Sequence, residues 1–182
     1  MKALAINGSP RKDGNSSVLC RQFLRGAADA GHETKEIRLS EKRINPCIAC
    51  YRCLQDGHAC AQKDDMADIQ REMLAADVIV LATPVYFYSL SAQMKMLIDR
   101  CLPRYREMKG KRFYFIVTAA EPRHDAAYEA LGSMRGFLRC LSGATEEGVV
   151  YGTGTWGIGD VFKHPSYEKA YQMGKEVKEE MA

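Results

Sequence analysis

The sequence contains no apolar stretch long enough to cross a membrane, and its first residues lack the pattern of a cleavable signal peptide. It also has little excess of either charge, because 23 Asp and Glu balance 26 Lys and Arg and leave a formal net charge of +3. A charge this small argues against a surface that binds nucleic acid or a membrane. We therefore expect a cytoplasmic protein with a small partner, and with neither nucleic acid nor membrane as a partner.

Internal repeats, low-complexity linkers and a nucleophile elbow are absent as well. Hydrolysis through a covalent intermediate therefore has no support, and we assign no catalytic side chain. With 182 residues, of which 46% are hydrophobic, the chain can build one globular core without disulfides. We predict a single domain over residues 1–182 with one cysteine-rich loop at about 45–62.

The sequence does contain a regular alternation of two patterns. Apolar runs of strand length are separated by longer segments whose apolar residues recur every three or four positions. The runs are Lys2–Ile6, Thr34–Leu39, Asp77–Ala82, Phe113–Thr118 and Glu147–Tyr151. Strands that alternate with helices predict an α/β fold, here a three-layer sandwich around a five-stranded parallel sheet. We expect the last segment, Tyr167–Glu180, to be an amphipathic helix that covers an edge of the sheet.

A polar loop from Asn7 to Ser17 follows the first predicted strand and leads into a predicted helix. At the carboxyl end of a parallel strand, backbone N–H groups and the positive end of the next helix create an anion site. The side chains that can donate a hydrogen bond or positive charge to a phosphate are Ser9, Arg11, Lys12, Asn15, Ser16 and Ser17. A simpler interpretation also stays open, in which residues 15–17 only cap the helix.

A second loop, rich in aromatic residues, follows the third predicted strand. Ligands of a doubly wound sheet bind where the strand order reverses, which places this loop beside the polar one. Residues 84–88 offer flat apolar side chains and backbone hydrogen-bonding groups, as a planar flavin ring requires. Core packing is the alternative, and it suits Phe87 better than the two tyrosines, whose hydroxyls need partners. The segment 118–121 is expected to form a third wall.

Several motifs in the first 101 residues together resemble one protein family. They are Gly8-Ser9-Pro10-Arg11 with Asn15-Ser16, Asp64-Asp65-Met66, Thr83-Pro84-Val85-Tyr86, and Lys95 with Asp99-Arg100. In this order they resemble the NADPH-dependent FMN reductases and iron-sulfur flavoproteins. The resemblance implies a flavodoxin-like sheet of order 2-1-3-4-5, FMN at the strand ends, NAD(P)H as reductant, and a homodimer or homotetramer.

The resemblance also implies roles for individual residues. It places the FMN phosphate against Ser9, Arg11, Asn15, Ser16 and Ser17, and the flavin ring against Pro84, Val85, Tyr86 and Phe87. Thr118, in the expected third wall, is a further candidate for contact with the cofactor. Asp99 and Arg100 are expected to be a structural or interface pair. For Trp156, in a glycine-rich segment, two interpretations compete: packing over its own helix, or covering a flavin.

Seven cysteines in a chain without an export signal indicate metal or redox chemistry rather than a disulfide framework. Cys47, Cys50, Cys53 and Cys60 have the spacing C-x2-C-x2-C-x6-C, in which a tight loop can present its thiolates to one centre. This spacing is similar to the motif that ligates a [4Fe–4S] cluster in iron-sulfur flavoproteins. Zinc, reversible thiol chemistry and replacement of one thiolate by His58 are alternatives. The remaining cysteines, expected to be small buried side chains in helices, are Cys20, Cys101 and Cys140.

The combined patterns predict an FMN-dependent oxidoreductase, similar to NAD(P)H-dependent FMN reductases. It would accept hydride from NAD(P)H and pass electrons to an unidentified small-molecule or protein acceptor. A first alternative is an iron-sulfur flavoprotein that carries electrons through a [4Fe–4S] cluster on the cysteine loop. A second is a redox-sensing or zinc-stabilised binding module.

Overall fold

The computed structural model describes residues 1–55 and 59–178 of the protein. Its centre is one sheet of five parallel strands in the order β2-β1-β3-β4-β5, which confirms the flavodoxin-like fold. The strands are β1 (Lys2–Asn7), β2 (Glu33–Arg38), β3 (Val78–Pro84), β4 (Arg112–Ala119) and β5 (Thr145–Thr153). The predicted strands correspond to these five, with the largest difference at β5, which begins at Thr145 rather than Glu147.

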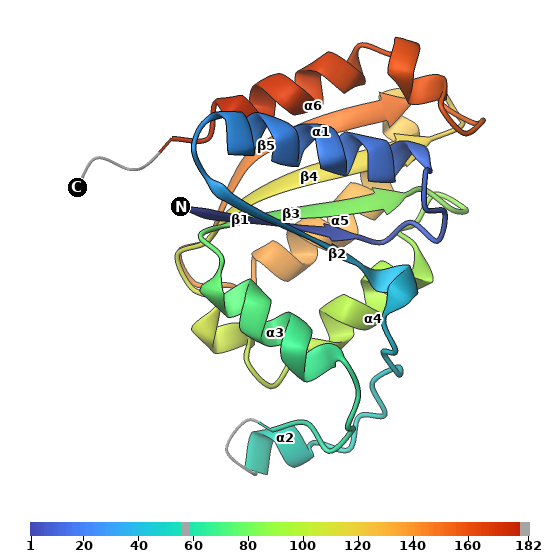
Figure 1. The fold of residues 1–182 in the computed structure, drawn as a ribbon. Coiled ribbons are helices and arrows are strands. Elements are labelled where there is room, and N and C mark those ends of the chain that lie inside the picture. Colours follow the sequence, from blue (N-terminus) through green and yellow to red (C-terminus); the bar gives the residue numbers. More distant parts are fainter. Residues whose placement is uncertain (56–58, 179–182) are drawn as a thin grey trace.

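Helices cover both faces of the sheet (Figure 1). The α-helices are α1 (Asn15–Asp29), α2 (Arg52–Gln55), α3 (Met66–Ala75), α4 (Ala92–Arg100), α5 (Tyr128–Leu138) and α6 (Ser166–Lys175). Short 3-10 helices are η1 (Leu39–Glu41), η2 (Tyr105–Glu107), η3 (His124–Ala127) and η4 (Asp160–Lys163). None of the helices in the described ranges is long and apolar enough to cross a membrane.

Alternate residues of β1 show how the sheet separates two cores. Ala3 and Ala5 belong to the core under α1 and α6, whereas Leu4 and Ile6 belong to the core under α3, α4 and α5. All four side chains are fully buried, as expected for a central strand covered on both faces. The small residues on one side leave room for α1 to lie close to the sheet.

Helices α1 and α6 are packed backbone to backbone. A Cβ atom added to Gly26 of α1 would lie 2.0 Å from the carbonyl oxygen of Tyr171, and one added to Gly174 of α6 would lie 2.0 Å from that of Phe23. The predicted C-terminal helix is therefore seated on α1 as well as beside the edge strand β5. It ends at Lys175, earlier than the predicted Glu180.

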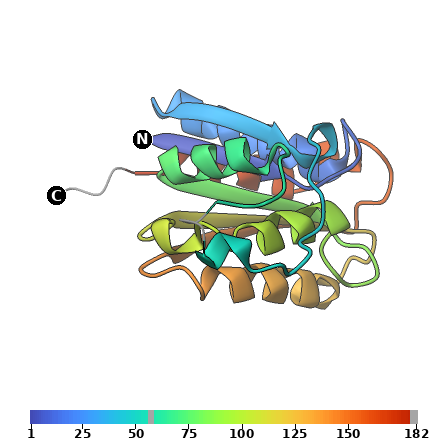
Figure 2. The ribbon, with the colours of Figure 1, turned by 90° about the horizontal axis from the view of Figure 1, so that it is seen from below.

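The segment between β2 and α3 departs from the alternating pattern. Between η1 and α3, the residues that the structure describes contain one short helix, α2, and they lie below α3 and α4, away from the sheet (Figures 1 and 2). We call residues 45–64 the cysteine segment.

Candidate cofactor sites

Loops at the carboxyl ends of β1, β3, β4 and β5 enclose a cavity of 160 Å³, which we call the ring cavity. Eight of the ten residues expected to contact FMN line it, namely Ser9, Arg11, Asn15, Ser16, Pro84, Val85, Tyr86 and Thr118. The other lining residues are Gly14, Ala119, Ala120, Thr155 and Trp156. The polar loop, the aromatic loop and the expected third wall therefore meet at one place.

The polar loop is held in a tight turn by its own side chains. The Ser9 hydroxyl accepts a hydrogen bond from the Arg11 backbone N–H at 3.2 Å, and the Ser17 hydroxyl donates to the Arg11 carbonyl at 2.9 Å. A Cβ added to Gly14 would lie 2.9 Å from Ser9 Oγ, so only glycine fits this turn without displacing the serine. Ser17 is fully buried and stabilises the loop from behind the ring cavity.

The N-terminus of α1 has no side-chain cap. Gly14 is the N-cap residue, no side chain accepts a hydrogen bond there, and no acidic residue lies in the first turn. Asn15 instead donates to the Gly157 carbonyl at 3.0 Å, so it does not act as the cap. The first N–H groups of this helix therefore face the loop as a positive helix end, which is suited to an anion.

The aromatic loop is joined to the third wall. The backbone N–H of Val85 donates to the Thr118 carbonyl at 2.7 Å, and the hydroxyls of Thr118 and Ser16 share a hydrogen bond of 2.9 Å. Tyr86 and Ser89 exchange two backbone hydrogen bonds of 2.9 Å across a tight turn. Hydrogen bonds thus link the polar loop, the third wall and the aromatic loop around the ring cavity.

Phe87 occupies the tip of this turn rather than the cavity. Phe87 and Tyr88 adopt left-handed backbone angles, with φ of 49° and 63°, which is costly for large side chains. Phe87 is 102% exposed, so the structure does not place it in the core, and it does not line the ring cavity. We call residues 86–89 the aromatic turn.

Trp156 lies at the rim of the ring cavity and is 78% exposed, so it does not pack over its own helix. The Asp160 carboxylate accepts hydrogen bonds from the backbone N–H groups of Trp156 and Gly157, at 2.9 and 2.7 Å. Arg11 reaches the Trp156 carbonyl with Nη1 at 3.5 Å. Thr155, beside it in the wall, is a lining residue that the sequence analysis missed, although the dense glycines after β5 marked this segment.

The four cysteines of the C-x2-C-x2-C-x6-C motif line a second, small cavity of 30 Å³. Burial, followed by the neighbouring thiols of Cys60, Cys50 and Cys47, raises the pKa of the Cys53 thiol. Within residues 1–55 and 59–178, no three His, Cys, Asp or Glu side chains are close enough to hold a metal ion as they stand. His58, the alternative ligand, lies outside the described residues.

Two left-handed residues shape the loop between the first three cysteines. Ala49 and Tyr51, on either side of Cys50, have φ of 51° and 56°. Such angles cost about 1–2 kcal/mol in non-glycine residues, and they persist where the surrounding structure requires them. Four soft thiol donors that face one cavity match the ligand set of an iron-sulfur cluster or of zinc.

A buried ion pair closes the cysteine segment. Arg100, the last residue of α4, donates to both carboxylate oxygens of Asp64, at 2.8 and 3.0 Å. Burial alone would raise the pKa of the Asp64 carboxyl, but hydrogen bonds from Arg100 and from the backbone N–H groups of Asn45 and Met66 outweigh it, and the pKa is lowered. Asp99 instead pairs with Lys95, at 2.5 Å, so Arg100 and Asp99 do not form the expected pair.

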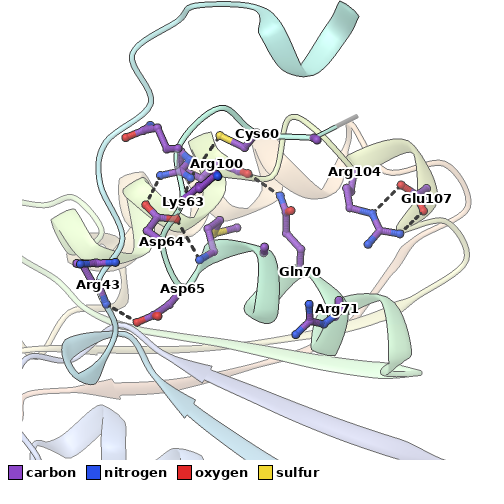
Figure 3. Close-up of a pocket in the computed structure, with 14 residues that line it drawn as sticks. Arg43, Cys60, Lys63, Asp64, Asp65, Gln70, Arg71, Arg100, Arg104 and Glu107 are labelled. Carbon is purple, nitrogen blue, oxygen red and sulfur yellow. Dashed lines mark hydrogen bonds and ion pairs between the residues drawn. The ribbon is translucent and has the colours of Figure 1, made fainter. Parts of the chain in front are cut away.

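A groove of 820 Å³ runs along this ion pair (Figure 3). Its charged lining comes from the cysteine segment and the residue before it at 43, from α3, and from the end of α4 and the turn that follows. It includes Arg43, Lys63, Asp64, Arg71, Arg100 and Arg104. Cys60 lines both this groove and the small cysteine cavity. The groove therefore gives solvent a path to one of the four thiols.

The remaining cysteines differ from one another. Cys20 and Cys101 are buried as expected, and burial raises the pKa of the Cys101 thiol to about 12. The expectation for Cys140 is wrong, because this side chain is exposed. Helix α5 ends at Leu138, so Cys140 lies in the turn that follows rather than on a packed helical face.

The fold and the ring cavity together define a flavodoxin-like protein in which the uncapped N-terminus of α1 lies beside a cavity at the strand ends. The chain belongs to the NADPH-dependent FMN reductase family, whose model matches residues 1–151.

Several relatives carry the name iron-sulfur flavoprotein. One, from Methanocaldococcus jannaschii, is 47% identical over 103 residues, which is 57% of this chain and 53% of the relative. Another, from Archaeoglobus fulgidus, is 41% identical over 133 residues, covering 70% of this chain and 60% of the relative. The match thus spans about half to three fifths of each relative's length. An NAD(P)H:quinone oxidoreductase structure from Methanothermobacter marburgensis has the same fold, with a TM-score of 0.74 at 16% identity over 98% of this chain and 99% of that one.

Proposed function

We propose that this protein is an iron-sulfur flavoprotein that holds FMN in the ring cavity and a [4Fe–4S] cluster on Cys47, Cys50, Cys53 and Cys60. In this function it takes electrons from NAD(P)H and passes them to a small-molecule or protein acceptor. The observation that carries the proposal is that all four cysteines of the motif line one cavity in a chain that also has a flavin-type cavity.

Support for FMN comes from the polar loop and the uncapped helix. The FMN phosphate would bind at the N-terminus of α1, where Ser9, Ser16 and the backbone N–H groups of the first turn donate, and where Arg11 supplies positive charge. Ser17 would hold the loop in shape. Bound FMN supplies both two-electron and one-electron chemistry, and the chain's part is to fix and orient it.

The flavin ring would lie between the aromatic loop and Trp156. Pro84, Val85 and Tyr86 line that end of the ring cavity, while Phe87 stands outside it at the tip of the aromatic turn. The cavity volume of 160 Å³ is below the roughly 300 Å³ at which ligand pockets begin, so a ring there would extend beyond it. Exposed Tyr86 and Trp156 at this rim, with exposed Phe87 at the tip of the neighbouring turn, favour a homodimer or homotetramer in which another copy covers the ring.

A second candidate is an NAD(P)H-dependent FMN reductase without a cluster. It is favoured by the finding that no three potential ligands in the described ranges stand at metal-binding distance. The same four thiols could then act in reversible thiol chemistry or hold zinc, as in a redox-sensing or zinc-stabilised binding module.

Anaerobic purification followed by metal and flavin analysis separates these candidates. We expect one FMN, four irons and four acid-labile sulfides per chain, with loss of the iron in the Cys50→Ser variant and retention in the Cys140→Ser control. Yellow, iron-free protein that oxidises NADPH would support the reductase instead. Stoichiometric zinc without flavin would refute both in favour of the binding module.

A further inference from the structure

Arg100 is a buried, charged side chain that does not line the ring cavity. Its side chain is 1% exposed, at the end of α4, and it points into the cysteine segment (Figure 3). Taking a guanidinium out of water is costly unless its donors find acceptors. The positions of those acceptors therefore show what this residue holds in place.

Three of the acceptors come from the two ends of the cysteine segment. Nη1 donates to the Asn45 carbonyl at 2.7 Å and to Asp64 at 2.8 Å. Nη2 donates to the other Asp64 oxygen at 3.0 Å and to the Sγ atom of Cys60 at 3.4 Å. The sulfur of one motif cysteine thus shares its donor nitrogen with a buried carboxylate.

The charges around Cys60 indicate that its contact with Arg100 has an electrostatic role as well as a structural one. The Asp64 side chain is fully buried and neutralises Arg100, so the pair by itself carries no net charge. The Nε atom of Arg100 is buried and has no hydrogen-bond partner in the described part of the chain. A guanidinium whose Nη2 donates to a sulfur is suited to a sulfur that becomes negatively charged.

We propose that Arg100 is a positioning residue for the metal centre: its Nη2–H···Sγ hydrogen bond orients the Cys60 thiolate as a ligand and raises the reduction potential of the centre. This inference rests on the proposed cluster. Reduction adds negative charge to the cluster and its sulfurs, and a hydrogen-bond donor with positive charge stabilises that state. Asp64 holds the guanidinium in the orientation that aims Nη2 at the sulfur.

The test compares reduction potentials in reconstituted holoprotein, because a purely structural role would not change them. The variants are Arg100→Gln, which removes the charge, and Arg100→Lys, which keeps it without the two-pronged geometry. Arg104→Gln is the matched control, since Arg104 lines the same groove but its side chain pairs with Glu107 rather than with a cysteine of the motif. Iron content and the potential, from a redox titration followed by electron paramagnetic resonance, are measured for each.

We expect Arg100→Gln to shift the potential to more negative values, Arg100→Lys to shift it less, and Arg104→Gln to match the wild type. Wild-type potential in an Arg100→Gln protein with full iron would overturn the inference and leave the proposed function intact. If Arg100→Gln loses iron, circular dichroism and thermal unfolding of its apoprotein show whether the fold is retained. A wild-type fold without iron supports the ligand role, and an unfolded apoprotein overturns it. Wild-type protein that takes up no iron would refute the proposed cluster itself.

Discussion

Replacing Gly26 by alanine tests how closely α1 is seated on α6. The added Cβ would lie 2.0 Å from the Tyr171 carbonyl oxygen and 2.8 Å from the Lys175 nitrogen, whereas ordinary contact begins at 3.4 Å. Overpacking costs about 1–3 kcal/mol, and the rigid backbone neighbours favour the upper value of about 3. The higher helix propensity of alanine stabilises α1 by about 1 kcal/mol, so we expect the free energy of unfolding to fall by about 2 kcal/mol.

The measurement is thermal unfolding of Gly26→Ala beside Gly132→Ala. For a domain of this size, 1 kcal/mol corresponds to about 2–4 °C, so we expect Tm to fall by about 4–8 °C in the first variant. Gly132 lies in α5 with no atom within 4 Å of its added Cβ. Its replacement should therefore stabilise the fold by about 0.5–1 kcal/mol. A Gly26→Ala protein as stable as the wild type would refute the close packing of α1 on α6.

Three further predictions follow from single side chains. At pH 8, Cys140 should be alkylated by iodoacetamide and Cys101 spared, because Cys101 is buried with a pKa of about 12; mass spectrometry of the native protein checks this, and modified Cys101 would contradict it. Arg11→Gln should weaken FMN binding by about tenfold or more, because it removes one charge-assisted contact, and fluorescence titration measures this change. Lys12→Gln is the control and should leave the affinity unchanged, because Lys12 does not line the ring cavity. Phe87→Asn should stabilise the protein by about 1 kcal/mol in urea unfolding, since asparagine tolerates the left-handed angle and no packing is lost; a lower midpoint would count against strain in the aromatic turn.

The sheet and its order could be predicted because strands buried on both faces appear as unbroken apolar runs. Val78–Pro84 is an example, buried at six of its seven positions. The parallel order then places the loops after β1, β3 and β4 at one edge, so the convergence of Ser9, Val85 and Thr118 follows from topology alone.

What could not be predicted depends on contacts between distant residues or on local strain. Arg100 and Asp64 are 36 positions apart, and nothing in their neighbours marks them as a pair. The fold of the segment at Trp156 depends on the carboxylate of Asp160, which a glycine-rich sequence does not reveal. The aromatic turn has neither glycine nor asparagine where φ is positive, so residue preferences point away from the conformation that Phe87 adopts.

The ion pair of Arg100 with Asp64 holds together the two ends of the cysteine segment. Asn45 donates its backbone N–H to the same carboxylate at 2.9 Å, so the two ends of a 19-residue separation meet at one point. The entropy of closing such a loop changes slowly, by about 0.6 kcal/mol for each doubling of its length. Residues could therefore be added or removed between Cys53 and Cys60 at little thermodynamic cost to the sheet. The enclosed stretch can be treated as a replaceable insert, and a designed metal-binding loop could be grafted between Asn45 and Asp64.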